Sequence, residues 1–181
     1  AGYTGLSAAL HLAPDISPVV IEANEVGYGA SGRNNGLVIP TLSKADPEEI
    51  IRIFGQEKGE QTIALIRDSA SLVFNLIRKH NMEKAGEQTG WIQPAHSPGR
   101  MKLIEKRVTE WRKRGLKADL LDKEQLEGLV GSSAWFGGWI AHDGGTIHPM
   151  AYVRGMAKAV VNLGARIFTN SPALSLTRDD N

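Results

Sequence analysis

Hydrophobic residues recur at helical spacing in one long stretch of the chain, between Gln56 and His80. The residues on the repeating face are Ile63, Ile66, Ala70, Val73, Phe74 and Ile77. Because positions three and four apart share one face of a helix, this pattern predicts a long amphipathic helix. Just before it, Asp46 and Pro47 have the character of an N-cap and a first helical residue, so a second helix is expected to begin there.

Shorter patterns predict the remaining elements. Further helices are expected at residues 4–12, from Pro98 to a stop at Gly115, in a short stretch capped by Asp122, and at residues 150–163. Strands are expected at residues 19–22, 37–39, 90–94, 118–121, 135–141, 166–168 and 173–176. Strand and helix alternate at both ends of the chain, whereas the middle is rich in helix. This order predicts an α/β fold with a nucleotide-binding sheet that a second domain interrupts.

Composition narrows the class of protein. The 181 residues are 41% hydrophobic and 23% charged, which is enough for a core and unlike a disordered chain. A net charge of +1 gives no field that favours nucleic acid or an anionic membrane, and no apolar run approaches the ~18 residues of a membrane span. Cysteine is absent from the sequence, which excludes disulfides, thiolate metal sites and a cysteine nucleophile within these 181 residues. We expect a cytoplasmic protein with a small-molecule substrate, and nothing indicates its oligomeric state.

Candidate chemistry begins at the first residues. Gly2 and Gly5, with Tyr3 and Thr4 between them, have the spacing of the last two glycines of G-x-G-x-x-G. Such glycines let a backbone approach a pyrophosphate, whose charge the N–H groups at a helix start favour. Glu22 and Ala23 end the following strand, where a carboxylate can accept the hydroxyls of an adenosine ribose. The set predicts a dinucleotide site.

A second loop, at residues 27–36, is rich in glycine and small polar residues. It supplies backbone N–H groups, a hydroxyl and a guanidinium, which suit phosphate oxygens. Its candidate binding residues are Ser31, Arg33, Asn34, Asn35 and Gly36. The alternative is that Arg33 is a surface charge and that the small polar residues are turn formers.

With this loop the chain resembles the D-amino-acid oxidase superfamily of FAD-dependent oxidoreductases, in its glycine oxidase, sarcosine oxidase and gamma-glutamylputrescine oxidase-like branch. The motifs that carry the resemblance are AGYTGLSAAL, VVIEA, GYGASGRNNG, DGGTIHPMAYVRGMAKA and GARIF. The resemblance implies a Rossmann-like FAD-binding domain (GR2-type, βαβ) at residues 1–45 and 143–181. It also implies an α+β substrate domain at residues 46–142. The chain has no starting Met and closes on a polar turn at residues 177–181, so we expect the N-terminal part of a longer protein.

The resemblance also implies roles for single residues. Glu22 would hold the ribose, and Gly2 to Gly5 with Ser31 and Arg33 would hold the pyrophosphate. Asn34, Asn35 and Gly36 would approach the flavin, and the backbone of Ala173 would meet the adenine side. The implied reaction is oxidation of a small amine or amino acid by hydride transfer to FAD. The catalytic groups of this superfamily lie mostly later than this chain, so no catalytic residue is predicted.

Several alternatives stay open. The first 22 residues fit a nicotinamide-dependent dehydrogenase equally well, and a non-catalytic dinucleotide-binding module would share the fold. His142, Asp143 and His148 invite a metal-site interpretation, but turn and strand positions explain them better. A basic run near residues 106–114 is interpreted as the solvated face of a helix. Trp135, Phe136 and Trp139 are expected to fill a core.

Overall fold

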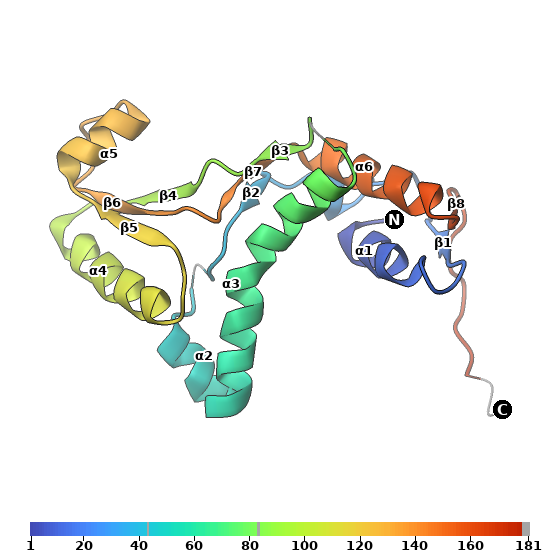
Figure 1. The fold of residues 1–181 in the computed structure, drawn as a ribbon, viewed down its shortest axis with the longest axis horizontal. Coiled ribbons are helices and arrows are strands. Elements are labelled where there is room, and N and C mark those ends of the chain that lie inside the picture. Colours follow the sequence, from blue (N-terminus) through green and yellow to red (C-terminus); the bar gives the residue numbers. More distant parts are fainter. Residues whose placement is uncertain (43, 83, 179–181) are drawn as a thin grey trace. The chain divides into compact units, whose positions relative to one another are not determined.

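The computed structural model describes residues 1–42, 44–82 and 84–178. The chain forms two compact units: unit 1 comprises Ala1–Gly36, Leu76–Gly86 and Ile147–Asn181, and unit 2 comprises Leu37–Asn75 and Glu87–Thr146. The chain passes between the units four times, so neither unit is one continuous stretch (Figure 1).

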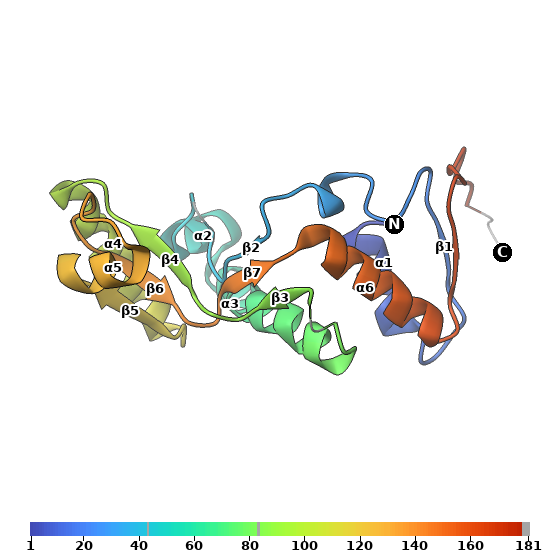
Figure 2. The same cartoon turned by 90° about the horizontal axis from the view of Figure 1, so that it is seen from above.

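Unit 1 contains a parallel pair of strands with two helices packed against it. Its elements are α1 (Tyr3–Leu12), β1 (Val19–Ile21), the 3-10 turn η1 (Ala30–Gly32), α6 (Pro149–Asn162) and β8 (Arg166–Phe168). β1 pairs with β8 in parallel, with Val20 opposite Ile167. The two helices lie side by side in both views, and each contacts the strand that follows it (Figures 1 and 2). Two helix–strand segments far apart in sequence therefore form one Rossmann-like layer.

The core of unit 1 lies on α1 and α6. The residues that these helices bury are Leu6, Ala9, Leu10, Tyr152, Val153, Met156, Ala157, Ala159 and Val160. α6 begins with Pro149, whose missing N–H costs nothing in a first turn. His148 caps it, because its Nδ1 accepts a hydrogen bond from the N–H of Ala151 at 3.2 Å.

Unit 2 holds most of two three-stranded sheets. The order β4-β6-β5 joins β4 (Trp91–Pro94), β6 (Gly138–Ala141) and β5 (Ala118–Leu121) in antiparallel pairs. The order β2-β7-β3 joins β2 (Leu37–Val38), β7 (Gly145–Ile147) and β3 (Gly86–Glu87). The helices are α2 (Pro47–Phe54), α3 (Gln56–Lys79), α4 (Pro98–Lys113) and α5 (Lys123–Val130). The chain passes between the units within α3, β3 and β7.

Two tryptophans dominate the core of unit 2. Trp111 of α4 and Trp139 of β6 are both 0% exposed, and Ile104 and Val108 pack in the same cluster. The ring of Trp139 meets Trp91 edge-on, with centroids 5.4 Å apart. Ile104, Val108 and Trp111 thus form the buried face of α4, the helix that was predicted from Pro98 onward. Among the described residues, no helix has both the length and the apolar character needed to cross a membrane.

Most predicted elements are present, with ends displaced by a residue or two, but two of the predicted strands were wrong in whole or in part. Residues 173–176 form no strand: Leu174 and Leu176 are 91% and 99% exposed, and in the described chain no strand pairs with them. The strand predicted at 135–141 begins only at Gly138, because Gly137 has a φ of +117° that breaks the extended run. The polar turn predicted at 177–181 reaches beyond the described residues.

Asp46 begins α2 as predicted, but its carboxylate accepts no capping bond from that helix. It forms an ion pair with Arg107 of α4 at 2.6 Å. Likewise Phe136, expected in a core, is 50% exposed, whereas Trp139 is buried.

The predicted domain ranges and the compact units differ in three segments, at residues 37–45, 76–86 and 143–146, the last of which belongs to unit 2. Residues 37–45 belong to unit 2, because Val38 of β2 pairs with Gly145 of β7. Residues 76–86 belong to unit 1, where Met82 lies against α6: a Cβ added at Gly155 would lie 2.7 Å from its sulfur. The assignment of one unit to FAD and the other to substrate stays a prediction.

Candidate cofactor-binding site

The start of α1 is joined directly to the glycine-rich loop. Gly2 is the N-cap of α1 and has no side chain to cap it. Ser31, 28 residues away, supplies the cap, since its Oγ accepts a hydrogen bond from the N–H of Tyr3 at 3.0 Å. A Cβ added at Gly2 would lie 2.8 Å from that Oγ. The two predicted phosphate-binding segments therefore meet, and only glycine permits the contact at this distance.

Glycines also fix the course of the loop between residues 27 and 36. Gly27 has a φ of +78°, and its N–H donates to the carbonyl of Ala1 at 3.1 Å. Gly36 has a φ of +74°, and its carbonyl accepts from the N–H of Ile147 at 2.8 Å. A Cβ at Gly36 would lie 2.1 Å from the carbonyl oxygen of Ile147. Both ends of the loop are thus tied to backbone of unit 1 at positions that disfavour a side chain.

The junction leaves several backbone donors available. Within the described chain, no hydrogen bond is made by the N–H groups of Thr4 and Gly5 at the start of α1, nor by those of Gly29, Ala30 and Ser31 at the start of η1. The first N–H groups of a helix have no partner inside the helix, and the helix dipole makes them attractive to anions. The donor set fits the pyrophosphate of a dinucleotide.

Arg33 adds a charged donor beside these groups. Its Nε donates to the carbonyl of Tyr28, and its Cζ lies 4.9 Å from the centroid of the Tyr28 ring. Its two terminal nitrogens donate to nothing in the described part of the chain. A guanidinium held from one side in this way presents a planar fork to a phosphate.

Glu22 lies at the same junction. Its carboxylate Oε1 accepts a hydrogen bond from the N–H of Asn24 at 2.9 Å. An ionised carboxylate has about four acceptor positions, so ribose hydroxyls can still be accepted. The carbonyl of Glu22 accepts from the N–H of Ser171 at 2.8 Å, which brings the segment leading to Ala173 alongside.

The structure places the other predicted residues less directly. Ala23 and Ala173 are exposed. Asn35 is exposed next to Asn34, whose side chain is engaged by the loop itself. Gly5 lies in α1 with nothing within 4 Å of an added Cβ in the described chain, so no packing contact there requires a glycine. The roles of these residues toward FAD stay predictions.

Sequence comparison matches residues 1–181 to the family of FAD dependent oxidoreductases, DAO. The chain belongs to this family. The gamma-glutamylputrescine oxidoreductase of Escherichia coli (strain K12) is 30% identical over 169 residues, which cover 92% of this chain and 39% of that protein. The DAO chain thus spans about two-fifths of the length of this curated relative.

Solved structures share the fold. The L-amino acid deaminase of Proteus vulgaris gives a TM-score of 0.80 at 19% identity, covering 99% of the DAO chain and 40% of its own. The glycine oxidase of Geobacillus kaustophilus gives 0.69 at 19% identity, covering 93% and 44%. At these identities the likeness shows the fold alone. It confirms the predicted α/β fold with a Rossmann-like FAD-binding domain, and the family match favours FAD over a nicotinamide cofactor.

The basic run of α4 in the DAO chain is less solvated than predicted. Arg107 and Arg114 have side chains only 10% and 18% exposed. Every member of the run has an acidic partner in unit 2: the pairs are Lys106–Glu48, Arg107–Asp46, Arg112–Asp119, Lys113–Glu110 and Arg114 with both Glu60 and Glu110. The pairs with Glu48, Asp46, Asp119 and Glu60 link α4 to neighbouring elements, whereas those with Glu110 lie within the helix and its C-cap.

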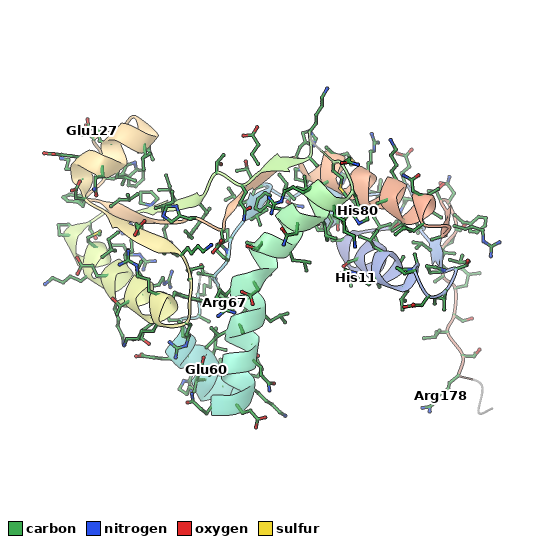
Figure 3. All side chains as sticks on the ribbon, in the orientation of Figure 1. His11, Glu60, Arg67, His80, Glu127 and Arg178 are labelled. Atoms are coloured by element: carbon green, nitrogen blue, oxygen red, sulfur yellow. The ribbon has the colours of Figure 1, made fainter. Side chains whose placement is uncertain are left out.

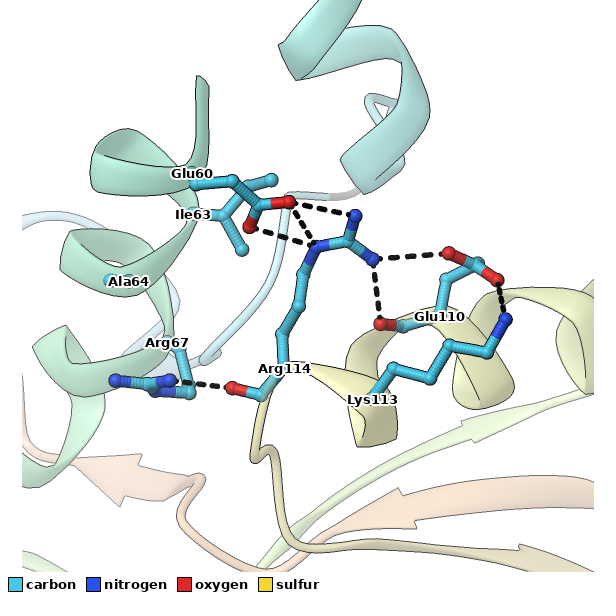
Figure 4. Close-up of a pocket in the computed structure, with 7 residues that line it drawn as sticks. All are labelled: Glu60, Ile63, Ala64, Arg67, Glu110, Lys113 and Arg114. Atoms are coloured by element: carbon cyan, nitrogen blue, oxygen red, sulfur yellow. Dashed lines mark hydrogen bonds and ion pairs between the residues drawn. The ribbon is translucent and has the colours of Figure 1, made fainter. Parts of the chain in front are cut away.

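A pocket of about 420 Å³ lies among these charges (Figures 3 and 4). Figure 4 shows Arg114 reaching between the carboxylates of Glu60 and Glu110, while Arg67 donates to the carbonyl of Arg114. Lys113 and Arg114 hold the pKa of Glu110 below its usual value, mainly through their hydrogen bonds. Because its charges already satisfy one another, the pocket is explained as an ion-pair network between α3 and α4.

The residues of the metal-site interpretation have other contacts. His142 hydrogen-bonds Asp119 through Nε2 at 2.7 Å, and His148 caps α6. Within the described residues, no three histidine, aspartate or glutamate side chains gather in a metal-binding group.

The sequence did not reveal the contacts of two tyrosines. Tyr3 packs edge-on against Tyr152 with ring centroids 5.3 Å apart, and its hydroxyl lies 3.4 Å from the carbonyl of Pro149. Burial, with Tyr3 as a second cause, raises the pKa of Tyr152 to about 12, so this phenol stays neutral. Only the tertiary packing of α1 on α6 brings these residues together.

Proposed function

We propose that the protein containing this chain is an FAD-dependent oxidoreductase acting on a small amine or amino acid, and that unit 1 binds the ADP part of FAD. The family match supports the cofactor. One observation supports the site: the hydrogen bond from Tyr3 to Ser31 joins two helix starts whose other N–H groups have no partner in the described chain.

In this proposal, each group has one task. The N–H groups of residues 4–5 and 29–31 and the guanidinium of Arg33 bind the pyrophosphate, where they offset its negative charge. Glu22 accepts the ribose hydroxyls. The 27–36 loop continues past Gly36 toward the flavin end. FAD, when bound, would accept a hydride equivalent from the C–H next to the substrate nitrogen.

The substrate class rests on the relatives. The names of the similar proteins point to gamma-glutamylputrescine, glycine and L-amino acids as the compounds to test first. All three carry a C–H bond next to an amine nitrogen, which is the bond that the proposed reaction breaks.

A spectrum and a reduction assay test the proposal in the complete protein. We expect the purified protein to be yellow, to release FAD on denaturation, and to lose its flavin absorption when one of these amines is added without oxygen. A colourless protein that binds NADH would contradict the cofactor assignment. A yellow protein that no amine or amino acid reduces would contradict the activity alone.

A further inference from the structure

The side chain of Asn34 forms hydrogen bonds through both its nitrogen and its oxygen within the glycine-rich loop. Its Nδ2 carries two hydrogens, which are shared among three acceptors: the carbonyls of Ala30 and Ser31, both at 3.1 Å, and the hydroxyl of Tyr3 at 3.3 Å. Its Oδ1 accepts from the N–H of Gly36 at 2.9 Å. The amide is therefore engaged at both of its ends by the chain itself.

These bonds determine where a neighbouring donor points. A trans peptide is planar, with its C=O and N–H on opposite sides. The carbonyl of Ala30 accepts from the side chain of Asn34 and from the N–H of Arg33, and this orientation turns the N–H of Ser31, in the same peptide, away from Asn34. That N–H is one of the donors without a partner in the described chain. The bond to Gly36 in turn stabilises the turn that ends the loop at a φ of +74°.

Tyr3 connects this arrangement to the helices. Its hydroxyl accepts from Asn34 and donates to the carbonyl of Pro149 in the first turn of α6. Its backbone N–H donates to Ser31. One residue of α1 thus contacts the loop at two points and α6 at a third.

We propose that Asn34 and Tyr3 are positioning residues for the phosphate-binding loop, with Asn34 fixing the loop's conformation and the Tyr3 hydroxyl tying it to α1 and α6. The inference rests on the proposed function. It assigns Asn34 an action through the loop's backbone, in place of the direct approach to the flavin that the sequence suggested.

Comparing the binding of ADP with that of adenosine distinguishes a loss of loop positioning from a general loss of protein stability. Both carry the adenine and ribose that Glu22 would serve, but only ADP carries the pyrophosphate. In the complete apoprotein, Asn34→Ala should raise the Kd of FAD and of ADP by about tenfold and leave the Kd of adenosine unchanged. Tyr3→Phe should raise the Kd of ADP about threefold, as expected for one neutral hydrogen bond.

A double-mutant cycle adds a second test. Because the two side chains share a hydrogen bond, Tyr3→Phe should weaken ADP binding less in the Asn34→Ala background than in the wild type. Asn162→Ala is the matched control: Asn162 is exposed at the end of α6, in the same unit, and its side chain has no partner in the described chain. This variant should bind ADP like the wild type.

The inference is overturned if Asn34→Ala binds FAD and ADP like the wild type, or if adenosine weakens by the same factor as ADP. If Asn34→Ala does not fold, Tyr3→Phe decides alone: a loss confined to ADP and FAD supports the inference, and an unchanged Kd overturns it. A wild-type protein that binds neither FAD nor ADP would instead contradict the proposed function.

Discussion

The two units use their polar groups in opposite ways. In unit 2, each basic side chain near the end of α4 is paired with a carboxylate. Arg114 lines the pocket among them and forms ion pairs there with Glu60 and Glu110. In unit 1, the side chain of Asn34 bonds the backbone of the 27–36 loop and that of Ser31 caps α1, while several N–H groups and the terminal nitrogens of Arg33 have no partner in the described chain. The proposed binding site is therefore argued from unpartnered backbone donors, and not from charge or pocket volume.

The two kinds of polar contact differ in how precisely they must be positioned. Ion pairs between side chains tolerate small displacements, because long side chains adjust. A backbone donor can be aimed only by fixing the backbone, which requires glycines, turns and close contacts. Unit 1 should therefore be sensitive to changes of a single methyl group in its loop, and unit 2 to changes in its core.

Gly36→Ala should have the largest effect on the site. Its φ of +74° disfavours a side chain, and the added Cβ would meet the Ile147 carbonyl at 2.1 Å. Backbone strain of ~2 kcal/mol would raise the Kd of FAD at least about 30-fold. Titration of FAD into the apoprotein measures it.

Gly128→Ala is the matched change in unit 2. Gly128 lies inside α5 with open space around an added Cβ. The variant should bind FAD like the wild type and be more stable to denaturant by ~0.5–1 kcal/mol. Equal FAD affinities for Gly36→Ala and the wild type would remove the contrast between the units.

Glu22→Ala should have the next largest effect. If the carboxylate accepts two ribose hydroxyls, its loss removes hydrogen bonds worth roughly 1.5–3 kcal/mol each, so FAD affinity should fall at least about tenfold. Glu25→Ala removes the same charge three residues later, from a side chain with no partner in the described chain. Equal Kd values for the two variants would exclude the ribose role.

Much of this architecture could be predicted because residues close together in the sequence determine it. The apolar spacing predicted α3, and the cap residue Asp122 predicted α5. In the structure Asp122 and Gln125 bond each other's backbone as a capping box. β3 and β7 were missed, since strands of two or three residues containing glycine exist only through their partners. The strand expected at 173–176 failed for the same reason, because a strand needs a neighbour.

The site shows the same division. The types and spacing of Gly2, Gly5 and Glu22 indicated a dinucleotide. The hydrogen bond between Asn34 and Gly36 had one local signal in the sequence: an asparagine two residues before a glycine is typical of an Asx turn. The hydrogen bond from Asn34 to the Tyr3 hydroxyl had no signal in the sequence, because 31 residues separate the two and only folding brings them together.

Trp139 and Trp111 test whether the stability of unit 2 depends on its core. Both are 0% exposed in one cluster, but Trp139 Nε1 donates to Gln93 Oε1 at 2.9 Å, whereas Trp111 Nε1 has no partner in the described chain. Trp139→Phe should therefore reduce the free energy of unfolding by ~1–3 kcal/mol more than Trp111→Phe, because it leaves Gln93 unpaired. Denaturant unfolding of both variants measures the difference, and equal losses would show that the hydrogen bond adds nothing.

The smallest expected effect is a pH dependence on the surface of unit 2. Asp119 accepts from His142 Nε2 and Arg112 Nη2, both at 2.7 Å, and these partners, His142 first, hold the pKa of Asp119 below its usual value. A carboxyl whose folded pKa is lowered stabilises the protein above its unfolded pKa, and that contribution is lost as the pH falls through the folded pKa. The difference in free energy of unfolding between wild type and Asp119→Asn should therefore become smaller on going from neutral to acid pH.

Glu127→Gln, at the exposed side chain labelled on α5 in Figure 3, controls for the loss of one negative charge. The difference for Asp119→Asn should be small because Asp119 is 59% exposed, and a difference that stays constant with pH would show that these contacts do not contribute to stability.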